Sequence, residues 1–260
     1  MAAALVVGMT LLQVEWIAHR GASDQAPENT LAAFRLGWQQ ADACELDIYL
    51  TKDGKIAVIH DATTKRTAGV DKPISQQTLD ELQALDAGSW KGATYAGEKI
   101  PTLKDVLELL PEKKRLFIEI KCGAEVLPEL KRTIDAFPAK AGRLAIIGFG
   151  RATMVEAKKL LPTIPVFWLA SYKADKTSGR HPDLDDLIAR CKADGLDGLD
   201  LDQAFPLDAA AVAKVHSAGL KLYTWTVNDP ETARKQAAAG VDGITTDRPD
   251  ALRRKLSTEK

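Results

Sequence analysis

Residues 44–50 read CELDIYL, and the alternation in this stretch decides the fold class. Apolar side chains stand at positions 44, 46 and 48, and two acids, Glu45 and Asp47, stand between them. Successive residues of a strand point to opposite faces, so the two acids share one face and the apolar side chains share the other. The stretch therefore predicts a strand whose apolar face packs against helices and whose acidic face points away from them.

Similar short apolar runs recur along the chain and alternate with amphipathic helical patterns. Eight strands that alternate with helices in a chain of 260 residues are typical of an α/β fold of the (β/α)8 TIM-barrel type. A doubly wound sheet is the second choice, because it also alternates strands with helices. The predicted strands are Trp16–His19, Cys44–Leu50, Leu116–Lys121, Leu144–Phe149, Val166–Ala170, Gly198–Leu201, Lys221–Val227 and Gly243–Thr246. The predicted helices are Asn29–Gln40, Leu103–Leu110, Ala124–Phe137, Arg151–Leu161, Asp183–Ala193, Leu207–Ala218 and Pro230–Ala239.

One part of the chain departs from this rhythm. After the second strand, residues 52–55 read as a turn and residues 56–60 as a further strand-like run. Residues 61–100 then carry several glycines and charges before the next helix. We interpret them as an insertion over the mouth of the barrel. No repeat or linker marks a second domain, so residues 1–260 are predicted to form one catalytic domain.

Charge and composition exclude some classes of protein. The formal net charge is −1, which argues against a nucleic-acid binder. The three cysteines, Cys44, Cys122 and Cys191, form no zinc pattern and are predicted to be reduced thiols. The composition leaves the oligomeric state open.

The N-terminal residues 2–12, AAALVVGMTLL, are almost wholly apolar but too short to span a bilayer. They fit a segment that covers the bottom of the fold or the remainder of an export signal, and Met9 is an alternative start. No later segment is long enough for a transmembrane helix. We predict a cytoplasmic protein without stable membrane insertion.

Three acids are expected to meet at one end of this barrel. Active sites of such barrels lie at the carboxyl ends of the strands, where Glu45, Asp47 and Glu119 would project together. Two carboxylates about 5 Å apart repel by roughly 3 kcal/mol at an effective dielectric constant near 20. A divalent cation relieves this repulsion, and ligands that are all oxygen favour Mg²⁺ or Ca²⁺ over zinc. The three acids are therefore candidate ligands of one divalent cation.

Two histidines and two cations stand at the same strand ends. His19 and His60 are candidates for an acid–base pair. Arg20 and Lys121 are candidates for binding a phosphate, although Arg20 would also serve as a buried ion-pair partner of Glu45 or Glu28. A metal ion, two cations and two imidazoles together suit phosphoryl transfer.

Five blocks of sequence resemble the glycerophosphodiester phosphodiesterase family. They run in order from about residue 16 to about residue 250, and together they are far more specific than any one of them. The blocks are His19-Arg20-Gly21-Ala22 with Pro27-Glu28-Asn29-Thr30; Glu45-Leu46-Asp47 with Thr51-Lys52-Asp53-Gly54 and Val58-Ile59-His60-Asp61; Phe117-Ile118-Glu119-Ile120-Lys121; Tyr223-Thr224-Trp225-Thr226-Val227-Asn228; and Gly243-Ile244-Thr245-Thr246-Asp247-Arg248-Pro249. One departure is Gly148 before Phe149, where many members of the family have a serine.

The resemblance implies a distorted barrel that hydrolyses a small-molecule glycerophosphodiester to sn-glycerol 3-phosphate and an alcohol. It implies the three acids as metal ligands, the two histidines as acid and base, Arg20 and Lys121 as phosphate ligands, and the segment after His60 as the family's cap. It also implies that Trp225 lines the glycerol or alcohol pocket with Phe149 nearby, whereas Trp225 would otherwise be a core aromatic.

Three alternatives to this function stay open from the sequence. One is a related barrel phospholipase, similar to sphingomyelinase D, and another is a broader phosphodiesterase. The third is a phosphate-binding barrel without catalysis. The alcohol preference, the choice between Mg²⁺ and Ca²⁺, and the division of acid and base between the two histidines also stay open.

Overall fold

Eight parallel strands close into a barrel in the computed structural model, which describes residues 14–258. The strands follow one another around the ring in the order β1-β9-β8-β7-β6-β5-β4-β2, and β1 pairs with β2 to close it. This confirms the predicted (β/α)8 barrel and excludes the doubly wound sheet. The strands are β1 (Glu15–Ala18), β2 (Ala43–Leu50), β4 (Arg115–Ile120), β5 (Leu144–Gly148), β6 (Val166–Ala170), β7 (Gly198–Asp202), β8 (Lys221–Trp225) and β9 (Gly243–Thr246).

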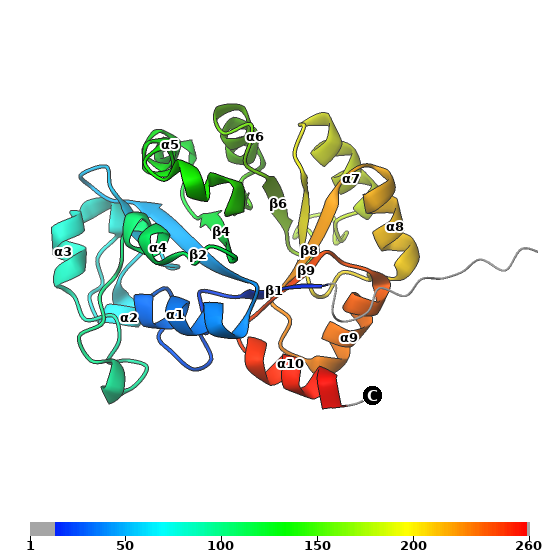
Figure 1. Ribbon diagram of the computed structural model, residues 1–260. Coiled ribbons are helices and arrows are strands. Elements are labelled where there is room, and N and C mark those ends of the chain that lie inside the picture. The colour runs from blue at the N-terminus through cyan, green and yellow to red at the C-terminus, as the bar shows by residue number, and fades with distance from the viewer. Residues whose placement is uncertain (1–13, 259–260) are drawn as a thin grey trace, which may run out of the picture.

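Helices surround this ring of strands (Figure 1). Asp229 caps α9 by accepting a hydrogen bond from the backbone of Thr232, and Gly240 ends that helix with φ of 97°, as the sequence predicts. The principal helices are α1 (Leu31–Gln40), α4 (Leu103–Leu109), α5 (Leu127–Asp135), α6 (Arg151–Leu160), α7 (Leu184–Ala193), α8 (Ala209–Ser217), α9 (Pro230–Ala239) and α10 (Pro249–Thr258).

The side chains of β2 divide as the alternation predicts. Cys44, Leu46 and Ile48 belong to the main hydrophobic core between the strands and the helices. Inside the barrel, a smaller apolar cluster fills the space beneath the mouth and gives the pocket above it a solid floor. This cluster contains Ile17, Ala43, Phe117, Ala145, Ile147, Phe167, Leu169 and Tyr223, with Trp225 packed against it.

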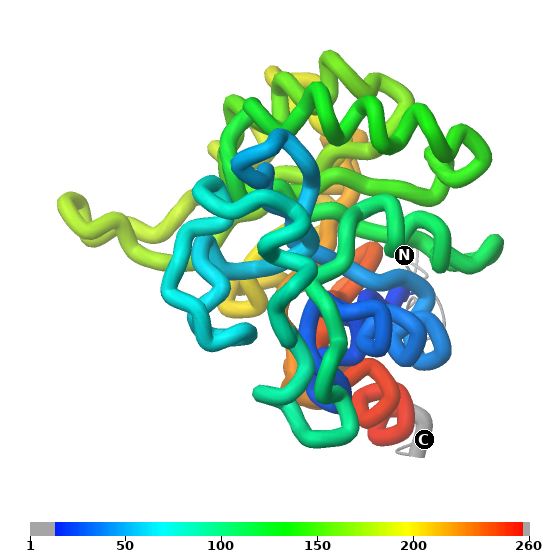
Figure 2. Tube along the Cα trace, turned by 90° about the vertical axis from the view of Figure 1, so that its left-hand side faces the viewer, coloured from blue at the N-terminus to red at the C-terminus, as the bar shows by residue number. Residues whose placement is uncertain are grey.

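The alternation of parallel strands and helices is interrupted after β2. β3 (Ile56–Val58) pairs antiparallel with β2, and residues 61–100 follow it. They contain two short helices, α2 (Lys65–Ala68) and α3 (Leu79–Ala84), and two 3-10 turns, η1 (Ile74–Gln76) and η2 (Ala93–Tyr95). Figure 2 shows this cyan to green-blue segment beside the blue start of the chain.

This segment has a small core of its own, formed by Ala57, Ile59, Ile74, Leu82, Ala87 and Ile100. It also docks on the loop between β1 and α1. Lys91 donates to the backbone oxygen of Ser23 at 2.6 Å, and the Tyr95 hydroxyl donates to that of Gln25 at 2.8 Å. The segment is therefore held against the start of the barrel by two hydrogen bonds to one loop.

Several predicted boundaries need correction. β1, β4 and β5 each end one residue earlier than predicted, so His19, Lys121 and Phe149 are the first residues after their strands. β8 ends at Trp225 and not at Val227. The predicted helix over residues 124–137 is a 3-10 turn, η3 (Ala124–Val126), followed by α5, because Pro128 favours a new helix start. A further 3-10 segment, η4 (Pro138–Arg143), precedes β5, and α10 was not predicted.

Gly21 allows the chain to turn sharply after β1. It has φ of 78°, and a Cβ atom there would lie 2.5 Å from the backbone carbon of Ala33. We expect Gly21→Ala to lower the free energy of unfolding by more than about 2 kcal/mol, because the contact is with backbone that has no alternative position. Chemical denaturation measures this.

Gly54→Ala is the matched control for that substitution. Gly54 has φ of 70°, but nothing lies within 4 Å of the position that a Cβ atom would take there. It should cost only the conformational strain of about 1 kcal/mol. Equal losses for the two variants would contradict the steric explanation for Gly21.

Residues 2–12 lie outside the described part of the chain, so the predictions about their origin and about cellular location stay predictions. Between residues 14 and 258, no helix combines the length and the apolar character needed to cross a membrane. The described cysteines form no disulfide, in agreement with the predicted thiols.

Candidate active site

A cavity of about 240 Å³ opens at the carboxyl ends of the strands. One half of its wall is ionic and comes from β1, β2, β4 and the residue pair after β3. The other half is largely apolar, comes from β5, β6, β7 and β8, and includes one acid, Asp200. The ionic half contains His19, Arg20, Glu45, His60, Glu119 and Lys121, and the apolar half contains Ile147, Phe149, Leu169 and Trp225. The structure thus brings together all the predicted site residues, with Asp47 buried directly behind the wall.

The three predicted metal ligands form one cluster. Oxygen atoms of Glu45, Asp47 and Glu119 all lie within 4.8 Å of one another. The strands explain this closeness, because Asp47 of β2 is paired in register with Glu119 of β4. The three side chains are buried, with residue exposures of 2%, 0% and 7%.

Burial and mutual repulsion alter the acidity of the cluster. Burial, with the charges of Asp47 and Glu119, raises the pKa of Glu45 well above its ordinary range. Burial and the Asp47 charge raise the pKa of Glu119 to about 7. Burial also opposes ionisation of Asp47, but Arg20 and Lys121 outweigh it and lower the pKa of that carboxyl. Asp47 is therefore the acid of the cluster that ionises most readily, and Glu45 and Glu119 resist ionisation beside it.

Two cations partly neutralise the cluster. Lys121 Nζ lies 2.9 Å from Glu119 Oε1 and 3.6 Å from Asp47 Oδ1. Arg20 Nε lies 3.4 Å from Asp47 Oδ2, and its Nη1 donates to Glu28 at 2.9 Å. The Arg20 backbone, at φ of 55°, also turns its N–H toward Glu45 at 2.9 Å. Arg20 is thus an ion-pair partner of Glu28, as its alternative interpretation predicted, and also of Asp47.

The cluster retains acceptor atoms suited to a cation. Glu45 Oε1 and Asp47 Oδ1 are buried and find no hydrogen-bond partner among the described residues. Asn29 holds the other Asp47 oxygen, donating at 2.8 Å. Buried acceptors without donors are costly unless a cation meets them. Three converging carboxylates with such oxygens fit a hard divalent cation.

His19 is oriented by a carboxylate from the opposite end of the chain. Its Nδ1 lies 2.7 Å from Asp247 Oδ1. Burial opposes ionisation of Asp247, but hydrogen bonds from His19, Asn228 and Ser23 prevail and lower its pKa. An ionised Asp247 only accepts, so Nδ1 carries the proton of this hydrogen bond. The Nε2 atom of His19 then faces the pocket, 4.0 Å from Glu45 Oε2.

His60 has the same arrangement with its neighbour in sequence. Its Nδ1 lies 2.7 Å from Asp61 Oδ1. Hydrogen bonds from Arg66, and to a lesser degree from His60, lower the pKa of Asp61 to about 2. Burial lowers the pKa of His60, to which the charges of Arg20 and Lys121 add, although Asp47 opposes them. His60 is therefore neutral near pH 7, with an unprotonated Nε2.

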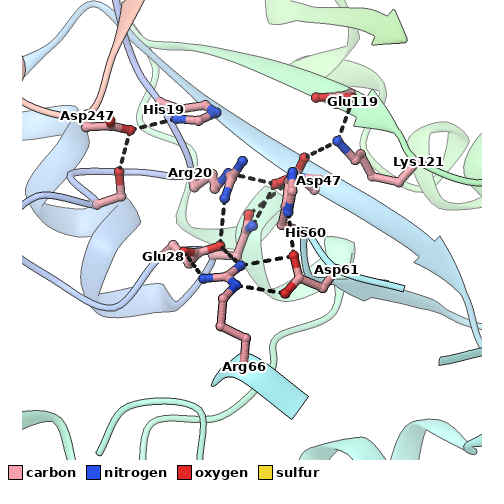
Figure 3. A network of polar contacts seen from close by, with 12 residues as sticks. His19, Arg20, Glu28, Asp47, His60, Asp61, Arg66, Glu119, Lys121 and Asp247 are labelled. Carbon is pink, nitrogen blue, oxygen red and sulfur yellow. Dashed lines mark hydrogen bonds and ion pairs between the residues drawn. The ribbon is translucent and has the colours of Figure 1, made fainter. Parts of the chain in front are cut away.

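Arg66 of α2 links this histidine to the arginine of the site. Figure 3 shows its guanidinium between Glu28 and Asp61. Nη1 and Nη2 donate to the Glu28 oxygens at 2.7 and 2.8 Å, and Nε donates to Asp61 at 2.7 Å. Glu28 in turn accepts from Arg20. Arg66 thereby positions both Asp61, which pairs with His60, and Glu28, which pairs with Arg20.

Sequence reasoning assigned no role to Asp247, Asn29, Arg66 or Asp200. Asp247 and Asn29 lie within the blocks that resemble the family, but the sequence does not indicate that they contact His19 and Asp47. Asp200 lies on β7 and lines the apolar half of the pocket. Burial, with the charge of Glu119, raises its pKa well above the ordinary range. The alternation of GLDLD over residues 198–202 was the available signal, because it repeats that of residues 44–50.

The two predicted pocket aromatics meet edge to face. The rings of Phe149 and Trp225 are 5.5 Å apart at 86°, and Phe149 is 44% exposed. The departure at Gly148 does not alter this wall. A Cβ atom there would contact the Met154 side chain, which belongs to the core behind the barrel. A serine hydroxyl at this position would therefore start away from the pocket.

Comparison with known proteins agrees with this geometry. The model of the glycerophosphoryl diester phosphodiesterase family matches residues 19–251. The chain belongs to this family. A glycerophosphodiester phosphodiesterase of Caldanaerobacter subterraneus subsp. tengcongensis is 37% identical over 241 residues, which cover 91% of this chain and 95% of that protein. Another, from Bacillus subtilis, is 30% identical over 252 residues, with coverages of 90% and 83%.

Solved structures of the family share the barrel. An Oleispira antarctica phosphodiesterase in complex with the product sn-glycerol-3-phosphate has a TM-score of 0.81 and 31% identity, covering 95% of this chain and 98% of that one. The glycerophosphodiester phosphodiesterase of Thermotoga maritima has a TM-score of 0.75 and 28% identity, covering 93% and 98%. As a member of the glycerophosphodiester phosphodiesterase family, the protein is a hydrolase of phosphate diesters.

Proposed function

We propose that the protein hydrolyses glycerophosphodiesters to sn-glycerol 3-phosphate and an alcohol, with one bound Mg²⁺ or Ca²⁺ and two histidines as acid and base. The observation that carries this proposal is the meeting of the carboxylate cluster with two histidine Nε2 atoms in one cavity. The product named in the Oleispira antarctica structure supports the choice of substrate class.

Glu45, Asp47 and Glu119 would hold the cation, because oxygens of all three converge and Glu45 and Asp47 each keep one without a hydrogen-bond donor among the described residues. A bound divalent cation supplies charge neutralisation for the phosphoryl oxygens and a template for the substrate. With a cation on the acids, Arg20 and Lys121 would no longer be the only positive charges that neutralise these acids. Both then have donors for a phosphate at the edge of the cluster.

The two histidines would divide the proton transfers. His60 suits the base, because its lowered pKa leaves Nε2 unprotonated near pH 7. It would accept the proton of the nucleophile, either water or the neighbouring glycerol hydroxyl. In the second case the product of the attack would be a cyclic phosphate, which water would then open to glycerol 3-phosphate. His19 would then donate from Nε2 to the leaving alkoxide, with Asp247 stabilising its charged form. Each transfer would supply about 10²–10⁴-fold in rate.

Release of glycerol 3-phosphate from glycerophosphocholine tests the proposal. We expect no release in EDTA and full release when Mg²⁺ or Ca²⁺ is restored in excess. Release that is unaffected by EDTA would remove the metal from the proposal and leave the histidines. Release only from other phosphate diesters, or hydrolysis of lipid vesicles in its place, would overturn the assigned substrate class.

A further inference from the structure

The floor of the apolar half of the cavity holds one acid that the proposed reaction does not use. Asp200 is 1% exposed and lines the cavity from β7. Its Oδ1 has no hydrogen-bond partner within residues 14–258. The flanking Leu199 and Leu201 point to the main core, so the carboxyl points into the barrel. A buried polar group without a partner costs free energy, and a ligand that reaches it recovers that cost.

Asp200 is not one of the three clustered acids, although the charge of Glu119 acts on it. In the closed ring, β7 is the fourth strand from β2 in either direction, so Asp200 lies across the barrel from Glu45 and Asp47. The indole N–H of Trp225 donates to the Asp200 backbone oxygen at 3.1 Å, which fixes the ring beside the carboxyl. A substrate whose phosphate occupies the ionic half would extend one arm over Trp225 toward Asp200.

The chemistry around this arm favours a hydroxyl over an ammonium group. Lys121 Nζ lies 6.0 Å from the centre of the Phe149 ring, and Lys173 also lines the cavity. An ammonium head group would meet both lysines, whereas a hydroxyl has no charge to repel. A hydroxyl also both donates and accepts, so it pairs with a carboxyl group in either protonation state.

The burial of Asp200 indicates which arm of the substrate, the glycerol or the alcohol, it contacts. Asp200 is nearly inaccessible, and the apolar cluster closes the barrel beneath it. A buried contact on a strand of the barrel suits the part of the substrate that never varies, which is the glycerol. The variable alcohol would then face the open side of the cavity.

We propose that Asp200 hydrogen-bonds a hydroxyl of the glycerol arm and thereby selects glycerol-containing phosphates. This inference rests on the proposed function, because it places the phosphate in the ionic half. It assigns Asp200 a role in specificity, separate from the residues that carry the chemistry.

Binding of matched ligands tests the role of Asp200 without turnover. Calorimetry would compare sn-glycerol 3-phosphate with n-propyl phosphate, which has the same carbon chain and no hydroxyl, on wild type, Asp200→Leu and Asp200→Asn. We expect wild type to prefer glycerol 3-phosphate by about tenfold or more, the typical consequence of one satisfied buried polar group. Asp200→Leu should lose most of this preference, and Asp200→Asn should keep most of it, because an amide still donates and accepts.

Two controls keep the outcomes distinct. Asp200→Leu should melt at the same temperature as wild type or higher, because it removes an unpaired buried polar group. Phosphocholine binding should be the same in all three proteins. An unchanged preference in Asp200→Leu, or loss of phosphocholine binding in its place, would overturn the inference. Failure of glycerophosphocholine turnover with the preference intact would instead contradict only the proposed reaction.

Discussion

His19→Ala and His60→Ala should each lower kcat on glycerophosphocholine by about 10²–10⁴-fold while the protein stays folded. Each imidazole has its Nδ1 held by an aspartate at 2.7 Å, so Nε2 is the atom left to move a proton. Alanine removes that atom and leaves the carboxylate cluster in place. Steady-state kinetics with saturating metal measures the loss, and thermal melting checks the fold.

His216→Ala is the matched control for the two histidines. His216 also pairs with an aspartate, Asp242, at 2.8 Å, but it lies on α8 and does not line the cavity. Its variant should keep the wild-type kcat. If His60→Ala or His19→Ala kept it as well, the assignment of acid and base would fail, since every other feature of the site would be unchanged.

Glu119→Gln should weaken metal binding by tenfold or more, which corresponds to about 1.4 kcal/mol or more. In the metal-free protein the same change should raise the melting temperature, because it removes one of three buried carboxylates within 4.8 Å of one another. Added Mg²⁺ or Ca²⁺ should raise the melting temperature of wild type, since a ligand that binds only the folded state stabilises it. The variant should show a smaller rise at the same metal concentration.

Glu129→Gln serves as the control for that charge change. Glu129 lies on α5, where it pairs with Arg132, and it takes no part in the cluster. Its metal titration should match that of wild type. An unchanged titration for Glu119→Gln would argue against its role as a ligand, even if the variant melted higher.

The period-two alternation of residues 44–50 made the central strands and the acidic cluster predictable. Strand faces follow from local geometry, so Glu45, Asp47 and Glu119 could be placed in one mouth without coordinates. His19 and His60 could be recognised as candidate site residues because each follows a short apolar run. Boundaries were less exact, because the last paired residue depends on a neighbouring strand that the sequence does not display.

Contacts between distant segments could not be predicted in the same way. Asp247 orients His19 across 228 positions, and Arg66 reaches Glu28 across 38. Neither pair carries a periodic signal, because the loops that bear them are not repeating structures. Asp200 had such a signal, but its significance lies in the lack of a partner, and only the assembled barrel reveals that lack among the described residues.

If His19 is the proposed acid, its pairing with Asp247 would link the gain of activity during synthesis to the last strand of the barrel. The ribosome makes His19 near the start of the chain and Asp247 near the end of the barrel. β1 cannot pair with β9 until that last strand has emerged. A nascent chain can thus carry the acids and both imidazoles and still lack an oriented His19. On the proposed mechanism, full catalysis would begin only when the ring is complete, so a chain that ends before Asp247 would be expected to release little product.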